Sequence, residues 1–193
     1  MGMVSNAQVG ELLVGGYHAL VTDAEVVSYN SRSKADGEQM EIDVVAIDSS
    51  DGIQTVYACE VVTHLGGAAY SGTPETDKWA DYGNDSYQYS LEKLESKFRS
   101  DYEYVTRVFD DADEYVLQLW APSLADGYLT DGLEALSADL EANDESGIGT
   151  GIDLVINETY TERIEELRTL AATETKSYGE PAFRFLQILE HLR

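Results

Sequence analysis

The chain has 193 residues, of which 43% are hydrophobic, and this supports one domain with a continuous core rather than a disordered chain. Its net charge is −25, from 37 acidic and 12 basic residues, and the acids are spread along the whole length. We interpret this pattern as adaptation to high salt in a halophilic cytoplasm. Because the Debye length falls to about 3 Å at molar ionic strength, the net charge does not exclude a nucleic-acid partner.

Composition excludes further classes of protein. The single cysteine, Cys59, lies in a predicted buried strand, which argues against a disulfide scaffold and a cysteine-based zinc site. The apolar runs are far shorter than the roughly 20 residues that span a bilayer, and the N-terminus lacks a basic region followed by an apolar stretch. We therefore expect a cytoplasmic protein with no membrane partner.

The N-terminal part of the chain is predicted to form a helix followed by three strands. Asn6 can cap the helix, in which apolar residues recur at helical spacing as far as residue 22. An alternating segment, 24–30, predicts the first strand, and two apolar segments, 41–48 and 56–64, predict the next two. The segment 48–52 joins them as a hairpin turn and contains the Asp-Gly dipeptide that such turns favour.

The rest of the chain is predicted to alternate helices and strands. A stretch rich in Gly, Ser, Thr and Pro, 66–76, leads into an aromatic-rich segment, 79–89, as one long irregular connection. Ser90 can cap the next helix. The remaining predicted elements are helices at 91–109, 129–140, 159–172 and 181–192 and strands at 114–120 and 152–156. This order predicts α/β layers around a mixed sheet.

Two of the predicted strands carry carboxylates among apolar residues. Asp43 and Glu60 would each cost several kcal/mol if buried without a partner, so their presence needs an explanation. Because side chains alternate along a strand, the two can share a face if the hairpin register allows it, while Cys59 and Val61 point the other way. Such a pair suits Mg²⁺ or Mn²⁺, which would polarise a phosphate and activate a bound water.

Three short motifs follow one another in an order that is similar to a known family. They are Gly10-Glu11 in the first helix, Glu41-Ile-Asp43 in the second strand and Cys59-Glu60-Val61 in the third. They resemble the PD-(D/E)xK nuclease superfamily, most nearly its Holliday-junction-resolvase and Mrr-type members, over roughly the first 110 residues. The resemblance implies a restriction-endonuclease-like three-layer α/β fold with a central mixed β-sheet flanked by helices. Because no linker is visible in the sequence, we expect one nuclease-like domain over 1–193, with a core at about 5–120 and a C-terminal α/β extension at about 121–193.

The same resemblance implies roles for individual residues. It makes Asp43 and Glu60 the metal ligands and Glu11 a supporting acid that orients water or a second ion. The family's lysine is expected two residues after Glu60, where this chain has Val62, and a valine cannot stabilise charge on a phosphate. Another group must replace it if cleavage is retained. The candidates are His64, which has the strand parity of Glu60, and Lys93 and Lys97, which share one face of the next helix.

Three functions remain open from the sequence. The first is a divalent-metal-dependent nuclease that acts on DNA or RNA, with a homodimer as an arrangement that related folds often use. The second, which rests on Val62, is a catalytically inactive nuclease-fold module that binds nucleic acid or protein. The third is a structural or assembly protein whose acids only serve solubility, so that Asp43 and Glu60 would lie apart. His18 and His191 are interpreted as structural.

Overall fold

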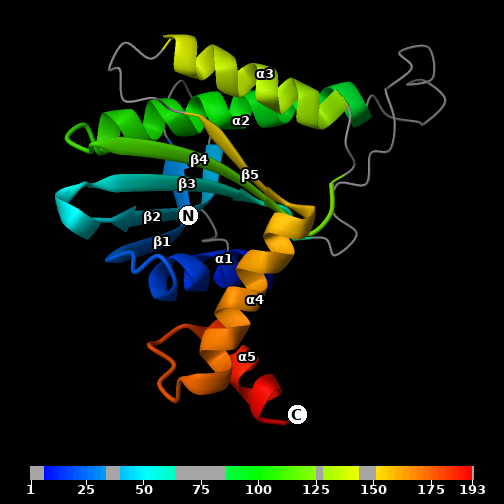
Figure 1. The fold of residues 1–193 in the computed structure, drawn as a ribbon. Helices are drawn as coiled ribbons and strands as arrows, with labels where there is room; N and C mark the ends of the chain where they lie inside the picture. Colours follow the sequence, from blue (N-terminus) through cyan, green and yellow to red (C-terminus); the bar gives the residue numbers. More distant parts are fainter. Residues whose placement is uncertain (1–6, 34–39, 64–85, 125–127, 144–150, 193) are drawn as a thin grey trace, which may run out of the picture.

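A computed structural model describes residues 7–33, 40–63, 86–124, 128–143 and 151–192. Its centre is a five-stranded sheet with the strand order β1-β2-β3-β4-β5 (Figure 1). The strands are β1 (Val26–Ser33), β2 (Met40–Asp48), β3 (Thr55–Val61), β4 (Glu114–Ala121) and β5 (Ile152–Ile156). Antiparallel pairing joins β1 to β2 and β2 to β3, and parallel pairing joins β3 to β4 and β4 to β5. The predicted mixed sheet is confirmed.

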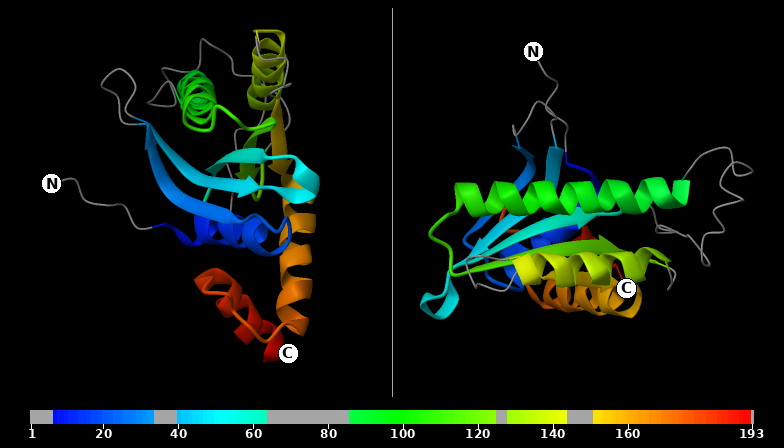
Figure 2. Two further views of the ribbon diagram at one scale, coloured as in Figure 1. Left: turned by 90° about the vertical axis from the view of Figure 1, so that its left-hand side faces the viewer. Right: turned by 90° about the horizontal axis from the view of Figure 1, so that it is seen from above.

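Helices cover both faces of this sheet. α2 (Ser86–Val108) and α3 (Tyr128–Asn143) lie on one face, and α1 (Val9–Leu20), α4 (Asn157–Thr173) and α5 (Pro181–His191) lie on the other (Figures 1 and 2). α2 and α3 are the crossovers that return the chain for the parallel strands β4 and β5. The arrangement is a three-layer α/β fold. Within the described ranges, no helix is both long and apolar enough to cross a lipid bilayer.

The core on the α2 side holds this layer against the sheet. Phe98 and Val105, which are fully buried, lie seven residues apart and therefore on one face of α2. They pack with Ile42 of β2, Ala58 of β3 and Leu119 of β4. Burying a large apolar side chain contributes about 1.5–3 kcal/mol, so this stripe is enough to fix which face of α2 meets the sheet.

A second core lies on the α1 side of the sheet. Val14 and Tyr17 of α1 pack with Trp120 of β4, Leu167 of α4 and Phe183 of α5. The Tyr17 and Trp120 rings have their centroids 5.2 Å apart. Because α4 and α5 follow β5, the C-terminal part of the chain completes both the sheet and this core.

The observed starts of two helices differ from the prediction. Asn6 lies outside the described residues, and α1 begins at Val9. α2 begins at Ser86, so Ser90 lies inside the helix rather than at its cap, and the last aromatic residues of the segment 79–89 are helical. Several helix-compatible residues precede Ser90, and a cap signal inside a longer helical run does not mark its end. The segment 66–76 lies outside the described residues.

The turn between β2 and β3 is ordered by a short 3-10 segment and by a side-chain hydrogen bond. It contains one 3-10 turn, η2 (Ser50–Gly52), and the Asp48 Oδ1 atom accepts a hydrogen bond from the Ser50 backbone amide at 2.9 Å. Gly52 has a φ of +80°, which glycine adopts without strain. The prediction that Asp48 belongs to the turn is confirmed.

Candidate functional site

Asp43 and Glu60 lie on neighbouring strands. Val44 pairs with Cys59 in the antiparallel ladder of β2 and β3, so the next step of the register places Asp43 opposite Glu60. The Val61 backbone amide donates a hydrogen bond to Asp43 Oδ2 at 2.8 Å. The side chains of Cys59 and Val61 belong to the core on the α1 side, as the alternation predicts. The two carboxylates are therefore neighbours in the sheet.

Glu60 forms an ion pair with Lys97 of α2. Glu60 is 3% exposed, and its Oε2 atom accepts a hydrogen bond from Lys97 Nζ. The Lys97 side chain is 21% exposed, so the pair is largely withdrawn from water. The second oxygen of Glu60, Oε1, is buried without a hydrogen-bond partner in the part of the chain that the structure describes. Glu60 therefore keeps one acceptor atom for a further cation.

Lys97, Lys93 and His64 are the three residues that could replace the family's lysine. The structure describes the side chain of Lys97 alone among them. Val62 packs against the core on the α2 side, on the same side of the sheet from which Lys97 reaches Glu60. Lys97 thus supplies an ammonium from the helix at a carboxylate two residues from the substituted position. Lys93 belongs to α2, but its side chain lies outside the description, and His64 lies outside the described residues.

Glu11 reaches the same region from α1. A Cβ atom on Gly10 would lie 3.1 Å from Thr63 Cγ2, so α1 approaches the chain just after β3 closely at this point. Glu11 is 4% exposed and accepts a hydrogen bond from the Gln8 backbone amide at 2.8 Å. Burial raises the pKa of the Glu11 carboxyl against the effect of this amide, and the charge of Asp43 adds to the increase. The helix acid and the strand acid therefore influence each other.

Asp43 has an environment that disfavours its charged form. Burial raises the pKa of the Asp43 carboxyl, although Lys97 and the Val61 amide lower it, and Glu41 raises it further. A carboxylate in this situation gains free energy when positive charge is brought near it. Acidic side chains from α1, β2 and β3 are thus gathered around one lysine of α2.

Asp101 is a further member of this cluster that the sequence analysis did not select. It is 0% exposed, and burial raises the pKa of its carboxyl to about 8, with Lys97 opposing the increase and Asp43 adding to it. A usable signal exists in the sequence. Asp101 lies three residues after Phe98 and four before Val105, within the apolar stripe of α2.

Asp43 and Glu60 are the two side chains of this site that could hold a hard divalent cation. Mg²⁺ is commonly held by one or two carboxylates and completes its shell with waters and phosphate oxygens. Among the described residues there is no group of three or more His, Cys, Asp or Glu side chains placed to hold a metal ion. The Oε1 atom of Glu60 without a hydrogen-bond partner is the observation that fits a cation here.

Comparisons of the chain with protein-family models, with curated proteins and with solved structures found no match. The assignment of roles in this site therefore depends on the geometry of the described residues and on the short motifs. These are Gly10-Glu11, Glu41-Ile-Asp43 and Cys59-Glu60-Val61.

A second buried polar group lies on the α1 side of the sheet. His18 is 1% exposed, and its Nε2 atom lies 3.0 Å from Gln118 Oε1. The same oxygen accepts hydrogen bonds from Trp120 Nε1 at 2.8 Å and from Cys59 Sγ at 3.3 Å, and Gln118 Nε2 donates to Asp153 Oδ2 at 3.0 Å. Burial lowers the pKa of His18 to about 4. This network links α1 to three strands, which agrees with the structural interpretation of His18.

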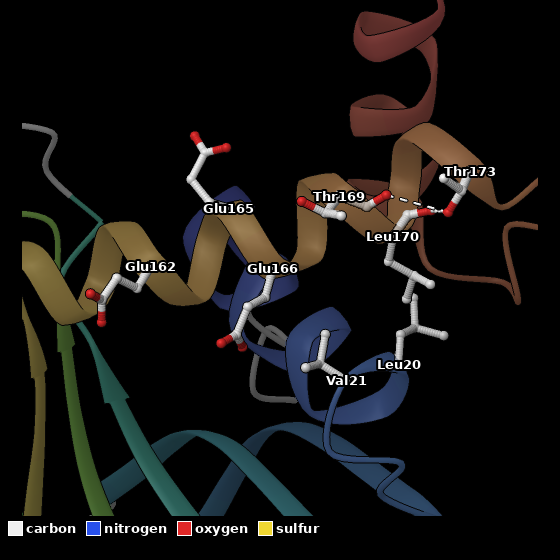
Figure 3. A pocket seen from close by; sticks show the side chains of 8 residues that line it. All are labelled: Leu20, Val21, Glu162, Glu165, Glu166, Thr169, Leu170 and Thr173. Atoms are coloured by element: carbon white, nitrogen blue, oxygen red, sulfur yellow. Dashed lines mark hydrogen bonds between the residues drawn. The ribbon is translucent and has the colours of Figure 1, made fainter.

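A surface groove of about 750 Å³ lies between α1 and α4 (Figure 3). Apolar side chains from both helices and three glutamates of α4 line it. The lining residues are Leu20, Val21, Glu162, Glu165, Glu166, Thr169, Leu170 and Thr173. The groove is at the C-terminal end of α1, whereas Glu11 is in its first turn. The groove is therefore separate from the carboxylate cluster, which consists of Glu11, Asp43, Glu60 and Asp101.

Proposed function

We propose that this chain is a divalent-metal-dependent nuclease-like protein that hydrolyses phosphodiester bonds of DNA or RNA. The working groups would be Asp43 and Glu60 as metal ligands, Lys97 as the cationic group and Glu11 as a supporting acid. The PD-(D/E)xK resemblance and the three-layer α/β architecture are compatible with this function, and the restriction-endonuclease-like fold is part of the proposal.

The observation that carries this proposal is the position of Lys97. The motif at the end of β3 lacks the family's lysine, because residue 62 is a valine. The Val62 side chain packs against the core. The α2 helix places an ammonium on Glu60, next to the strand that carries Asp43. Carboxylates and a cation at one point of a sheet are the groups that phosphodiester hydrolysis needs, since both the phosphate and the leaving oxygen carry negative charge in the transition state.

Asp43 and Glu60 are the residues that would hold Mg²⁺ or Mn²⁺. When bound, the cation supplies a Lewis acid for the phosphate and lowers the pKa of a coordinated water. The chain's own contribution is to hold two carboxylates of β2 and β3 in one register, with Glu60 buried and Asp43 partly buried. Glu60 offers its Oε1 atom, which has no partner among the described residues.

Lys97 and Glu11 have complementary tasks in this proposal. The Lys97 ammonium would stabilise negative charge on the phosphate oxygens during attack by water. Glu11, whose carboxyl pKa is raised by burial, would accept a hydrogen bond from the attacking water or from water around the metal. The water adds to phosphorus and the bond from phosphorus to the leaving oxygen breaks. One proton of the water stays with the new phosphate group, and the other reaches the leaving oxygen through solvent, so that it leaves as a hydroxyl.

The test is cleavage of labelled single-stranded, duplex and branched DNA and of RNA in molar KCl with Mg²⁺ or Mn²⁺. We expect Asp43→Asn and Glu60→Gln to reduce cleavage at least about 100-fold, because each removes charge that the metal and transition state require. Asp48→Asn is the matched control, since Asp48 lies on the same strand but binds the turn at Ser50. Unchanged cleavage in both site variants would refute the assignment.

A catalytically inactive module for nucleic-acid or protein binding is the second candidate, and the packing of Val62 favours it. It predicts no turnover of any substrate with any metal, while binding is retained. Val62→Lys is the informative variant, because it places a lysine two residues after Glu60, where the family motif has one. Cleavage that appears only in this variant would favour the inactive module, whereas cleavage by the unaltered chain would exclude it.

A further inference from the structure

Asp101 is an acidic residue in an apolar stripe. It lies on α2 between Phe98 and Val105 and is 0% exposed. Both carboxyl oxygens are buried, and neither has a hydrogen-bond partner among the described residues. Buried polar atoms are nearly always paired in folded proteins, so the two oxygens of Asp101 need an explanation, and both are acceptors that a nearby donor could use.

The charged groups around Asp101 come from several elements. Lys97 and Asp43 affect its ionisation directly, with opposite signs. Lys97 is bound to Glu60 of β3, and Asp43 is in turn influenced by Glu41 of β2. Glu11 of α1 interacts electrostatically with both Asp43 and Lys97. Lys97 is therefore the cation among these groups, and it lies on the same helix as Asp101.

Lys97 and Asp101 are separated by one helical turn. Residues four apart on a helix are neighbours on its surface, and Lys and Asp at this spacing can form an ion pair. The Lys97 ammonium is instead on Glu60. Lys97 thus has two acceptors within reach, one occupied on β3 and one unoccupied on its own helix.

A divalent cation at Asp43 and Glu60 would change the balance between these acceptors. It would compete with the ammonium for the oxygens of Glu60 and would repel the ammonium. We propose that Asp101 is a positioning residue that accepts one N–H of the Lys97 ammonium when Glu60 binds a divalent cation, so that the other N–H groups stay available to a phosphate. This inference rests on the metal site of the proposed function. Without Asp101, Lys97 would remain on Glu60 and oppose metal binding.

The experiment measures the affinity of the full chain for Mn²⁺ alone by calorimetry, in unaltered protein, Asp101→Asn, Lys97→Met and the double variant. We expect Asp101→Asn to weaken Mn²⁺ binding about tenfold in the presence of Lys97. In the Lys97→Met background, the same change should alter the affinity less than about twofold, because no ammonium needs a second acceptor. Asp101→Glu, which keeps the carboxylate, should recover part of the lost affinity.

Asp139→Asn is the charge-matched control. Asp139 is on α3, about half exposed, and pairs with Arg99 of α2, so Asp139→Asn makes the same acid-to-amide change without touching the cluster, and at a pH above about 8, where both acids are ionised, it also removes the same charge. Equal weakening by Asp101→Asn with and without Lys97 would overturn the inference, and so would no weakening in either. If Lys97→Met is unfolded by circular dichroism, Lys97→Gln replaces it. Absence of Mn²⁺ binding in the unaltered chain would instead refute the metal site and the proposed function.

Discussion

The two faces of the sheet both bury polar side chains, but they satisfy them differently. On the α1 side, His18 is bonded to Gln118, and the Gln118 amide uses its oxygen and its nitrogen in hydrogen bonds. On the α2 side, Asp101 and one oxygen of Glu60 lack partners among the described residues. Neutral groups dominate the first network, whereas carboxylates outnumber the ammonium in the second.

This difference separates a structural role from a functional one. A complete hydrogen-bond network fixes the packing of its elements and gains nothing from a ligand. An incomplete network of carboxylates is under electrostatic strain and gains free energy when a cation enters. The comparison therefore indicates the α2 side, and not the histidine network, as the place where the proposed cation would bind.

The largest expected effect comes from removing the cation of the α2 side. Lys97→Met should lower the free energy of unfolding by about 3 kcal/mol at neutral pH, because Glu60 would remain buried without its charge partner. Arg99→Met on the same helix is the control, since the Arg99 and Asp139 side chains are each about half exposed. We expect a loss below about 1 kcal/mol there. Equal losses in denaturant unfolding would contradict the distinction between the two pairs.

The histidine network should make the free energy of unfolding sensitive to acid. The pKa of His18 is about 4 in the folded chain and 6.5 when exposed, so the unfolded chain binds the extra proton between these values. Stability should therefore fall as the pH drops from 6.5 to 4, by up to about 3 kcal/mol from this residue. His18→Gln should remove that part of the pH dependence, and His191→Gln on the exposed side of α5 should leave it unchanged. Parallel profiles for the unaltered protein and His18→Gln would show that the network does not exclude the proton.

Asp101 should produce a pH dependence of opposite sign. Its pKa is about 8 in the folded chain and 3.8 when exposed, so the folded chain holds a proton that the unfolded chain lacks. This contribution to stability is complete below the unfolded value and is lost as the pH rises through about 8. Between pH 6.5 and 7.5, the loss should be about 1 kcal/mol. Asp101→Asn should flatten the profile in urea unfolding, whereas an unaltered slope would assign the titration to another group.

The smallest expected effect is on the surface acids of the groove. Glu162 is exposed on α4, so Glu162→Gln should change the free energy of unfolding by less than about 0.5 kcal/mol. The measurement is thermal unfolding at low and at molar KCl. A loss as large as that of Lys97→Met would show that exposed acids also hold the fold together, and the contrast between buried and surface carboxylates would fail.

Much of the fold could be predicted because its elements have clear local boundaries. β5 was predicted with the bounds that the structure has, Ile152–Ile156, since it is a short and mainly apolar run that directly follows glycine in the sequence. α5 begins at Pro181, and proline is favoured in the first turn of a helix. The start of α2 was placed too late because Ser90 resembles a cap, although the helical run begins four residues earlier.

The site could be predicted only in part. Asp43 and Glu60 were recognisable because a carboxylate in an apolar β-branched strand is unusual. The choice of Lys97 required the orientation of α2, which Phe98 and Val105 fix by packing against three strands. Asp101 was missed because one acid among many on a helix is usually solvated. Its spacing from Phe98 and Val105 is the signal that distinguishes it.

The core on the α1 side has a consequence for the order in which the chain matures. Val14 and Tyr17 of α1 pack against Leu167 and Phe183, which follow them late in the sequence. A growing chain leaves the ribosome N-terminus first, so α1 can pack against β1, β2 and β3 early, but the part of its apolar face that meets α4 and α5 stays uncovered until they arrive. Glu11 is on α1. The packing of the helix that carries Glu11 should therefore be completed only near the end of synthesis.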